Sequence, residues 1–271
     1  MGEIDAVYFV RRFSKSPTTG HQSEELRYSL RSLHGNFGEL GRVFVLGGRP
    51  DWLNRRTVHW RPGGEIFDRV DIGLLERWHD VKHLQTWSQW QAIARAAVDE
   101  LSDRFVIMND DFFVMHKVGE IPNQHRGSVK AWAEARRFGG DDASADVIER
   151  TANLVADRYG VDVADQVAYE THSPLTVNGH AFAAVMRDAQ SHYLTGGARL
   201  AKRSLVANAA RLPAELCQRD WKVFGAHDRD DWAAKPFLST TEDSFRHGTG
   251  PGEVGRYIRR AFRDPSPYEI C

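Results

Sequence analysis

Cysteine is almost absent from this 271-residue sequence, which has only Cys217 and Cys271. Two distant cysteines without a CxxC partner exclude a disulfide framework and favour a reducing compartment, so we expect a cytoplasmic protein. The sequence also lacks a basic, apolar leader and any run of about 18 apolar residues. We therefore expect neither a signal peptide nor a membrane-spanning helix.

An excess of either charge is also missing, since 36 Lys and Arg residues face 37 Asp and Glu residues, for a formal net charge of −1. No global basic field is present of the kind that attracts nucleic acids or anionic membranes. The hydrophobic share of 41% and the aromatic share of 11% suffice for one large core, with or without a small subdomain. The composition is that of a globular domain.

Signatures of several well-known catalytic sites are absent as well. The sequence has no GxSxG motif for a nucleophilic serine and no glycine-rich loop for cradling phosphates. His79 and His83 have the spacing of a metal-facing helical pair, but the glutamate of HExxH and a third ligand are missing. The sequence therefore gives no support for serine hydrolase or zinc peptidase chemistry.

Alternating strand and helix patterns fill the first half of the chain. They predict a strand at 4–10, a helix at 23–33, a strand at 42–46, a helix at 86–101 and a strand at 104–108. Right-handed crossovers make neighbouring parallel strands the default for such an order. We predict an α/β fold with a mostly parallel sheet flanked by helices.

The pattern changes near residue 131. Helices are predicted at 145–159, 179–193, 199–211 and 253–262, and no strong strand pattern returns before 235–239. We divide the chain into an α/β half suited to a nucleotide at 1–130, a mainly helical region at 131–234, and a closing strand and helix at 235–271. The last segment belongs to the same domain as the first.

Two adjacent acids follow the strand predicted at 104–108, where the chain reads Asn109, Asp110 and Asp111. The carboxyl ends of strands are where α/β sheets place their ligands. Hard oxygen ligands suit Mg²⁺ or Mn²⁺, so the acids fit a metal that bridges the diphosphate of a nucleotide-sugar. The alternative is that they only cap the following turn, a position that Asp favours.

Three further clusters carry candidate residues. Asp5 and Arg27 suit contacts with a base or ribose and with a phosphate, or an ordinary ion pair. His172 lies in a segment that Pro174 favours as extended and suits a general acid or base, although a lone histidine is more often structural. Asp243 and the acid before it form a second acidic pair, which either completes a metal site or belongs to an unrelated turn.

Several strings along the chain can be compared with a known family. The most specific is Glu25-Leu26-Arg27-Tyr28-Ser29-Leu30-Arg31-Ser32. The shorter ones are Ile4-Asp5-Ala6-Val7-Tyr8, the strand exit from Phe105 to Asp111, His172-Ser173-Pro174 with the later Arg203, and Ser266-Pro267-Tyr268-Glu269. In this order they resemble the blocks of the Stealth family of sugar-phosphate transferases.

The resemblance implies a GT-A-like fold, a divalent cation (Mg²⁺ or Mn²⁺) and a nucleotide-sugar donor, with a UDP-sugar as the first choice. It implies metal ligands at Asp110, Asp111 and Asp243, catalytic roles for Asp111, His172 and Arg203, and donor contacts from Asp5, Arg27, Ser88, Asn109 and Asp110. The helical region 131–234 would then face the acceptor.

Two segments depart from the family's strings. They are Phe9-Val10-Arg11-Arg12-Phe13, after the first strand, and Leu84-Gln85-Thr86-Trp87-Ser88-Gln89, which lacks the family's proline. Three activities therefore stay open. They are transfer of a sugar-1-phosphate to an acceptor hydroxyl, transfer of the sugar itself to a polysaccharide, protein or modified nucleic acid, and binding of a nucleotide or glycan without turnover.

Overall fold

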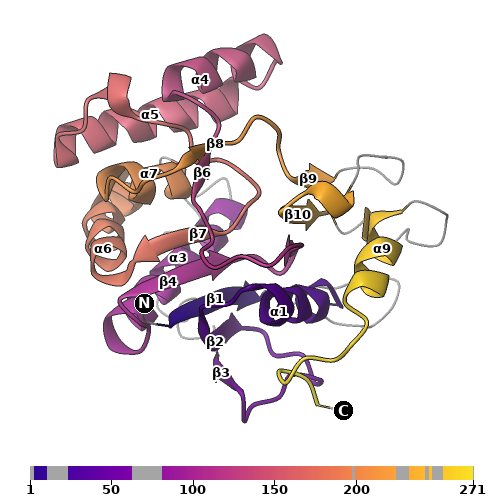
Figure 1. The fold of residues 1–271 in the computed structure, drawn as a ribbon. Coiled ribbons are helices and arrows are strands. Elements are labelled where there is room, and N and C mark those ends of the chain that lie inside the picture. Colours follow the sequence, from indigo (N-terminus) through magenta and orange to yellow (C-terminus); the bar gives the residue numbers. More distant parts are fainter. Residues whose placement is uncertain are drawn as a thin grey trace.

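A five-stranded sheet lies at the centre of the computed structural model, which describes residues 3–10, 24–62, 81–196, 199–223, 232–241, 244–245 and 253–270. The strand order is β3–β2–β1–β4–β7, with bounds Val58–Arg61, Leu40–Gly47, Ile4–Val10, Arg104–Met108 and Leu175–Asn178 (Figure 1). The first four strands are parallel, and β7 runs antiparallel to β4. This arrangement confirms the predicted α/β fold.

Helices cover both faces of the central sheet. Side chains along each strand alternate between the faces, so a strand that is apolar throughout needs a covering layer on each side. Tyr8 of β1 shares a buried cluster with α1 (Glu24–Asn36) on one face. Its neighbour Val7 belongs to the cluster on the other face, which includes α3 (Val81–Asp99) and α6 (Gly179–Gly196). Burial on both faces explains why the β1 sequence is almost continuously apolar.

A smaller three-stranded sheet, β5–β10–β9, continues from the carboxyl edge of the central sheet. Its strands are Phe112–Val114, Phe237–Thr240 and Lys222–Val223. β10 pairs antiparallel with β5 and parallel with β9. Because the chain passes from β4 to β5 through residues 109–111, this short loop is the junction between the two sheets, and we call it the acidic junction.

The region 131–234 is not purely helical. It contains most of α4 (Val129–Phe138), together with α5 (Asp142–Tyr159) and α7 (Lys202–Ala209), and Figure 1 shows α4 and α5 as a hairpin at one end of the molecule. The sequence pattern predicts no strong strand between residues 131 and 235, but this region supplies β7 to the central sheet. β7 has only four residues and β3 likewise, so neither had enough length to give a period-two signal.

The other elements are short or lie near the carboxyl end. β6 (Gln124–His125) pairs in parallel with β8 (Glu215–Leu216), and single 3₁₀ turns cover Val163–Asp165 and Trp232–Ala234. The last helix, α9 (Val254–Ala261), buries Val254 and Ile258 in the cluster of the small sheet. The helices predicted at 23–33, 86–101, 145–159, 179–193, 199–211 and 253–262 are all present, with ends that differ by a few residues.

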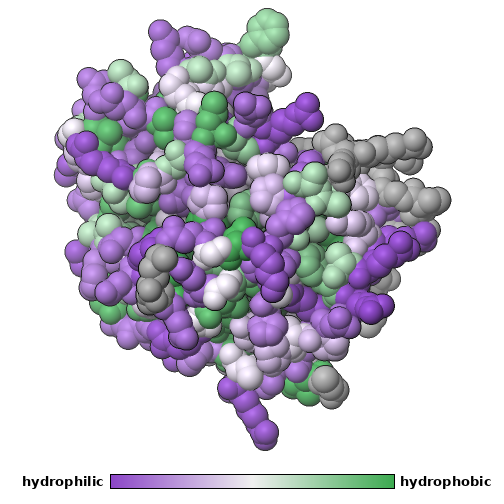
Figure 2. All heavy atoms as spheres, viewed as in Figure 1, coloured by the Kyte–Doolittle hydropathy of each residue, from purple (hydrophilic) through white to green (hydrophobic). Residues whose placement is uncertain are grey.

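The visible surface is mainly hydrophilic. On the face that Figure 2 shows, hydrophobic residues appear only in small groups among hydrophilic ones. The large hydrophobic side chains exposed in the described segments are Val98, Phe138, Leu216 and Ile270. None of the described helices has both the length and the apolar character that crossing a bilayer requires.

Candidate functional site

Asp111 lies at the acidic junction and is held by two strands of the small sheet. Its Oδ2 atom accepts hydrogen bonds from Lys222 Nζ and from Ser239 Oγ, each at 3.1 Å. Its backbone carbonyl accepts a hydrogen bond from the amide of Thr240, also at 3.1 Å. These contacts with β9 and β10 go beyond the capping of a turn, which was the alternative that the sequence left open.

Glu25, in the first turn of α1, is a third carboxylate beside the junction. Thr240 Oγ1 donates a hydrogen bond to Glu25 Oε1 at 2.6 Å. Burial, followed by the negative charges of Asp110 and Asp111, raises the pKa of Glu25 to about 7. Sequence reasoning missed this residue because an acid in the first turn of a helix is expected for local reasons.

The charge at the junction suits a divalent cation. The carboxylates of Glu25, Asp110 and Asp111 lie near one another, and the two acids of the junction add to the effect of burial in raising the pKa of Glu25. Mg²⁺ commonly takes one or two protein carboxylates and completes its shell with water and substrate phosphates, a pattern that Asp110 and Asp111 fit. Within the described residues, no three His, Cys, Asp or Glu side chains form a group that would hold a metal alone. The predicted ligand Asp243 lies outside the described residues.

His172 lies on the loop before β7, and its imidazole meets a carboxylate that sequence reasoning did not single out. Nδ1 of His172 is 2.8 Å from Oδ2 of Asp220. The His172 side chain is 37% exposed and that of Asp220 25% exposed. The histidine is therefore an oriented and accessible group, and not one enclosed in the core.

Arg203 holds the loop that carries His172. Its Nε atom donates to the carbonyl of Tyr169 at 2.9 Å, and its Nη2 atom donates to the carbonyl of Ser173 at 2.7 Å. Burial lowers the pKa of Arg203 to about 10, so the guanidinium remains charged near neutral pH. In this structure Arg203 fixes the loop backbone through these hydrogen bonds, and its contact with a phosphoryl group stays a prediction.

A single short segment connects His172 with the acidic junction. Asp220 pairs with His172, and Lys222, two residues later, pairs with Asp111. Two successive residues of extended chain span about 7 Å. The segment from Asp220 to Lys222 therefore links the histidine to the acidic junction.

Arg27 contacts the carboxyl-terminal tail. Its guanidinium carbon lies 4.8 Å from the centroid of the Trp52 ring, and its Nε atom is 3.4 Å from Oε2 of Glu269. The sequence left open a phosphate contact or an ion pair with Asp5. The structure shows an ion pair with a different partner.

Asp5 lies at the opposite edge of the sheet from the acidic junction. It is the second residue of β1, and its carboxylate is 2.7 Å from Arg42 Nη2. It also accepts hydrogen bonds from the amides of Arg42 and Ser102, each at 2.8 Å. These contacts stabilise the amino-terminal edge, and the structure does not bring Asp5 together with the acidic junction.

Two further predicted donor contacts, Ser88 and Asn109, differ in their exposure. Ser88 is buried on α3, and Asn109 is exposed, with its carbonyl accepting a hydrogen bond from the Phe112 amide at 3.2 Å. Sequence reasoning also missed Lys202, whose Nζ atom donates to Thr86 Oγ1 at 3.3 Å. Burial lowers the pKa of Lys202 to about 8, and the helical sequence pattern does not predict this burial.

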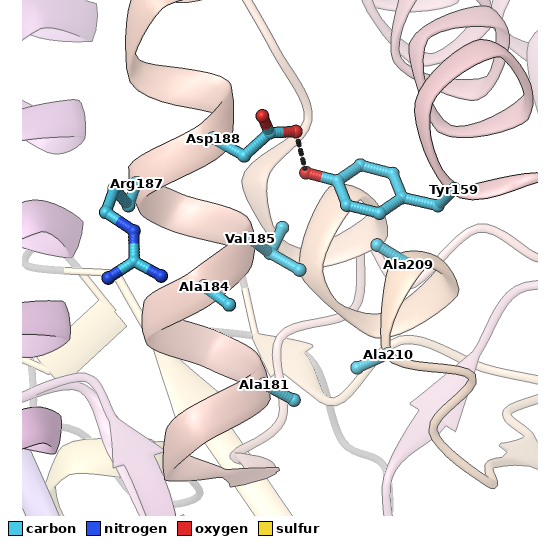
Figure 3. Close-up of a pocket in the computed structure, with 8 residues that line it drawn as sticks. All are labelled: Tyr159, Ala181, Ala184, Val185, Arg187, Asp188, Ala209 and Ala210. Atoms are coloured by element: carbon cyan, nitrogen blue, oxygen red, sulfur yellow. Dashed lines mark hydrogen bonds between the residues drawn. The ribbon is translucent and has the colours of Figure 1, made fainter.

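A surface pocket of about 660 Å³ lies elsewhere, between α6 and the ends of α5 and α7. Figure 3 shows small apolar side chains along it and the hydroxyl of Tyr159, which donates to Asp188 at 2.9 Å. α6 begins beside the start of β4, where the amide of Gly179 donates to the carbonyl of Asp103 at 2.8 Å. The pocket therefore lies toward the amino-terminal edge of the sheet, away from the acidic junction.

No protein-family model matches the chain, and the search of curated proteins finds no match. Among solved structures, 94 chains match it. One is the galactosyltransferase LgtC in complex with donor and acceptor sugar analogues, with a TM-score of 0.52 and 10% identity over 97% of this chain and 96% of that chain. The likeness shows the fold of a GT-A glycosyltransferase. It does not extend to the Stealth family in particular.

Proposed function

We propose that this protein is a transferase that uses a nucleotide-sugar donor and passes a sugar-1-phosphate to an acceptor hydroxyl. The observation that carries the proposal is that one short segment at the carboxyl edge of the sheet contacts both His172, through Asp220, and Asp111, through Lys222. In α/β folds this edge is the place where ligands bind. The GT-A fold and the neighbour's complex with donor and acceptor analogues support the same reading. The sequence resemblance to the Stealth family supports transfer of a sugar-1-phosphate in particular.

The acidic junction would hold the diphosphate end of the donor. Asp110 and Asp111 would bind a divalent cation, Mg²⁺ or Mn²⁺, which when bound neutralises charge on the diphosphate. Lys222 lies against Asp111 and would offer its ammonium group to the same oxygens. Asp243, as a further ligand, remains part of the proposal.

His172 would take the proton of the acceptor hydroxyl. In sugar-phosphate transfer, the acceptor oxygen bonds to the phosphorus that carries the sugar, and a nucleoside monophosphate leaves. Arg203 serves this step indirectly, because it fixes the backbone on both sides of His172. Most of the rate enhancement would come from positioning and electrostatics, as in phosphoryl transfer generally.

A glycosyltransferase is the second candidate, and the fold likeness favours it. In that reaction the acceptor oxygen bonds to the sugar C1, and a nucleoside diphosphate leaves. The acidic junction would then stabilise the leaving group, with no change in its residues. A polysaccharide, a protein and a modified nucleic acid all remain acceptors of the right chemistry.

Product analysis separates these two reactions. The purified protein is incubated with a panel of nucleotide-sugars, UDP-sugars first, with Mg²⁺ or Mn²⁺ and mixed hydroxyl acceptors, and the released nucleotide is identified by ³¹P NMR. Monophosphate release supports sugar-phosphate transfer, whereas diphosphate release supports the glycosyltransferase. Binding of a nucleotide-sugar by calorimetry with no turnover of any donor supports a binding module.

The matched variants are Asp111→Asn and Asp188→Asn. The first alters the acidic junction, whereas the second removes a carboxylate at the distant pocket, where it bonds Tyr159. We expect D111N to lose at least about 100-fold in kcat, in line with the loss of one electrostatic contact to the transition state, and D188N to keep its activity. Full activity of a folded D111N protein contradicts the assignment.

A further inference from the structure

We infer that Asp220 is the positioning residue of His172, and that it sets which imidazole nitrogen receives the acceptor's proton. The part of this inference that concerns proton transfer rests on the proposed function. The part that concerns the orientation of the His172 ring rests on the geometry alone. Nothing in the sequence marks Asp220, which lies in a polar loop before β9.

The contact between the two side chains has the geometry of a charge-assisted hydrogen bond. Oδ2 of Asp220 lies 2.8 Å from Nδ1 of His172. The other oxygen, Oδ1, accepts from the amide of Lys222 at 3.3 Å and makes a longer contact of 3.4 Å with the amide of His172. The carboxylate is therefore fixed by its own strand while it orients the imidazole.

Asp220 is ionised near neutral pH. Burial alone would raise the pKa of this carboxyl, but the hydrogen bond and charge of His172, with Lys222 and Arg126, outweigh burial and hold the pKa below its ordinary value. An ionised carboxylate only accepts hydrogen bonds. Nδ1 of His172 must then carry a proton, and the lone pair of the neutral ring is on Nε2.

The loop around His172 is fixed from the inside. The hydroxyls of Thr171 and Ser173 are buried and lie 2.9 Å apart, and Arg203 binds the carbonyl of Ser173. Interior contacts therefore fix the backbone of the loop, and Asp220 fixes the orientation of the His172 side chain, which points outward. Such a division is suited to holding a base in one orientation while leaving it accessible.

In the proposed transfer, Nε2 of His172 takes the proton of the acceptor hydroxyl. The acceptor oxygen forms its new bond to the donor, and the electron pair of the breaking bond leaves with the nucleotide. The imidazolium that results is stabilised by the Asp220 carboxylate and returns its proton to water. Atoms and charge balance without a further reactant.

The segment that carries Asp220 also contacts the acidic junction. Lys222, on the same short segment, binds Asp111 at 3.1 Å. A shift of this segment would move the histidine and the acidic junction together. The base and the diphosphate site are thus kept in a fixed relation by three consecutive residues.

The test combines a spectroscopic signature with kinetics. In ¹⁵N-histidine NMR of the full chain, we expect the neutral ring of His172 to show the Nδ1–H tautomer, and His172→Gln identifies its signals. In Asp220→Asn and Asp220→Ala the ring should move toward the Nε2–H tautomer. The control Asp188→Asn should leave the tautomer unchanged.

Kinetics then tests the role in transfer. We expect D220N to lower kcat about 10- to 100-fold with little change in the KM of the donor, as for the loss of an oriented general base. The double variant H172Q/D220N should be no slower than H172Q alone, because the residues act as a unit.

The outcomes separate the two claims. An unchanged tautomer in D220N, or an unchanged kcat, overturns the inference. If the wild-type protein transfers nothing from any donor while the tautomer still depends on Asp220, the proposed function fails and the positioning of His172 by Asp220 stands.

Discussion

Arg31 and Glu269 join the first helix to the end of the chain through two parallel hydrogen bonds, Nε to Oε1 at 2.7 Å and Nη2 to Oε2 at 2.6 Å. Both side chains are largely buried, at 10% and 5% exposure. Arg27 lies against the same carboxylate. Two strings that the sequence showed far apart, Glu25 to Ser32 and Ser266 to Glu269, are therefore parts of one contact.

Breaking this pair should destabilise the fold. In Glu269→Gln the buried guanidinium of Arg31 keeps its charge without a counter-charge, and we expect a loss of about 2–3 kcal/mol in the free energy of unfolding. Urea denaturation measures it. The control Glu149→Gln, which breaks an exposed pair with Arg137, should change the stability little. An equal effect of both variants contradicts the prediction.

The same pair should make the protein sensitive to acid. Burial alone would raise the pKa of Glu269, but hydrogen bonds from Arg31 and Ser266 outweigh it and hold the pKa below the ordinary 4.5. A depressed carboxyl pKa gives stability that is present above 4.5 and is lost as the pH falls through the folded value. In thermal melts, the wild-type protein should lose more stability than E269Q as the pH falls below the ordinary 4.5.

Glu25 should act in the opposite sense. Its folded pKa of about 7 lies above the ordinary 4.5, so its contribution to stability is lost as the pH rises between these values. Glu25→Gln should remove this slope and stabilise the metal-free protein at pH 8, measured with a chelator present. Added Mn²⁺ should restore stability in the wild-type protein, since a cation favours the ionised carboxylates. A slope that persists in E25Q would assign it to another group.

Lys222 should weaken cation binding at the acidic junction, because its ammonium group lies 3.1 Å from Asp111 Oδ2. Lys222→Met removes this positive charge, and we expect Mn²⁺ to bind about 10-fold more tightly. Calorimetry or electron paramagnetic resonance with the metal alone measures it. Lys130→Met, on an exposed face of α4, is the control. Unchanged affinity in K222M would place the cation elsewhere.

Lys202 should lower the stability of the folded protein at neutral pH. Its folded pKa of about 8 lies below the ordinary 10.5, so at neutral pH the charged form is disfavoured in the folded protein. The stability that this group contributes is present above 10.5 and is lost as the pH falls through 8. Lys202→Met should raise the melting temperature at pH 7 and flatten the pH dependence between these values. A lower melting temperature at pH 7 would contradict the burial cost.

Local pattern was sufficient where an element was long or ended sharply. The strand predicted to end before Asn109 runs from Arg104 to Met108 in the structure, because the apolar run stops at polar residues. The strand at 175–178 was missed, since four residues before a helix carry no periodic signal of their own. Only pairing with β4 makes it a strand.

The residues of the candidate site also differ in how far local sequence pattern predicted them. Asp111 was predicted as a site residue because two acids at a strand end are a local pattern. Arg203 was predicted only through the family resemblance, and its hydrogen bonds with the Tyr169 and Ser173 carbonyls could not be read from the sequence. Asp220 and Glu25 were missed, because an acid in a loop and an acid in a first helical turn are common for local reasons. Their importance comes from distant partners, His172 and Thr240.

The sequence by itself therefore determined the longer strands and helices, the α/β class and the acids at the end of β4, since each of these follows from residues close together in the chain. The tertiary structure decided which carboxylates and cations face one another. Asp5 pairs with Arg42, Arg27 with Glu269, Lys222 with Asp111 and His172 with Asp220. Such pairs form between residues whose separation along the chain carries no information about their distance, and only the packing of the two sheets and their helices brings them together.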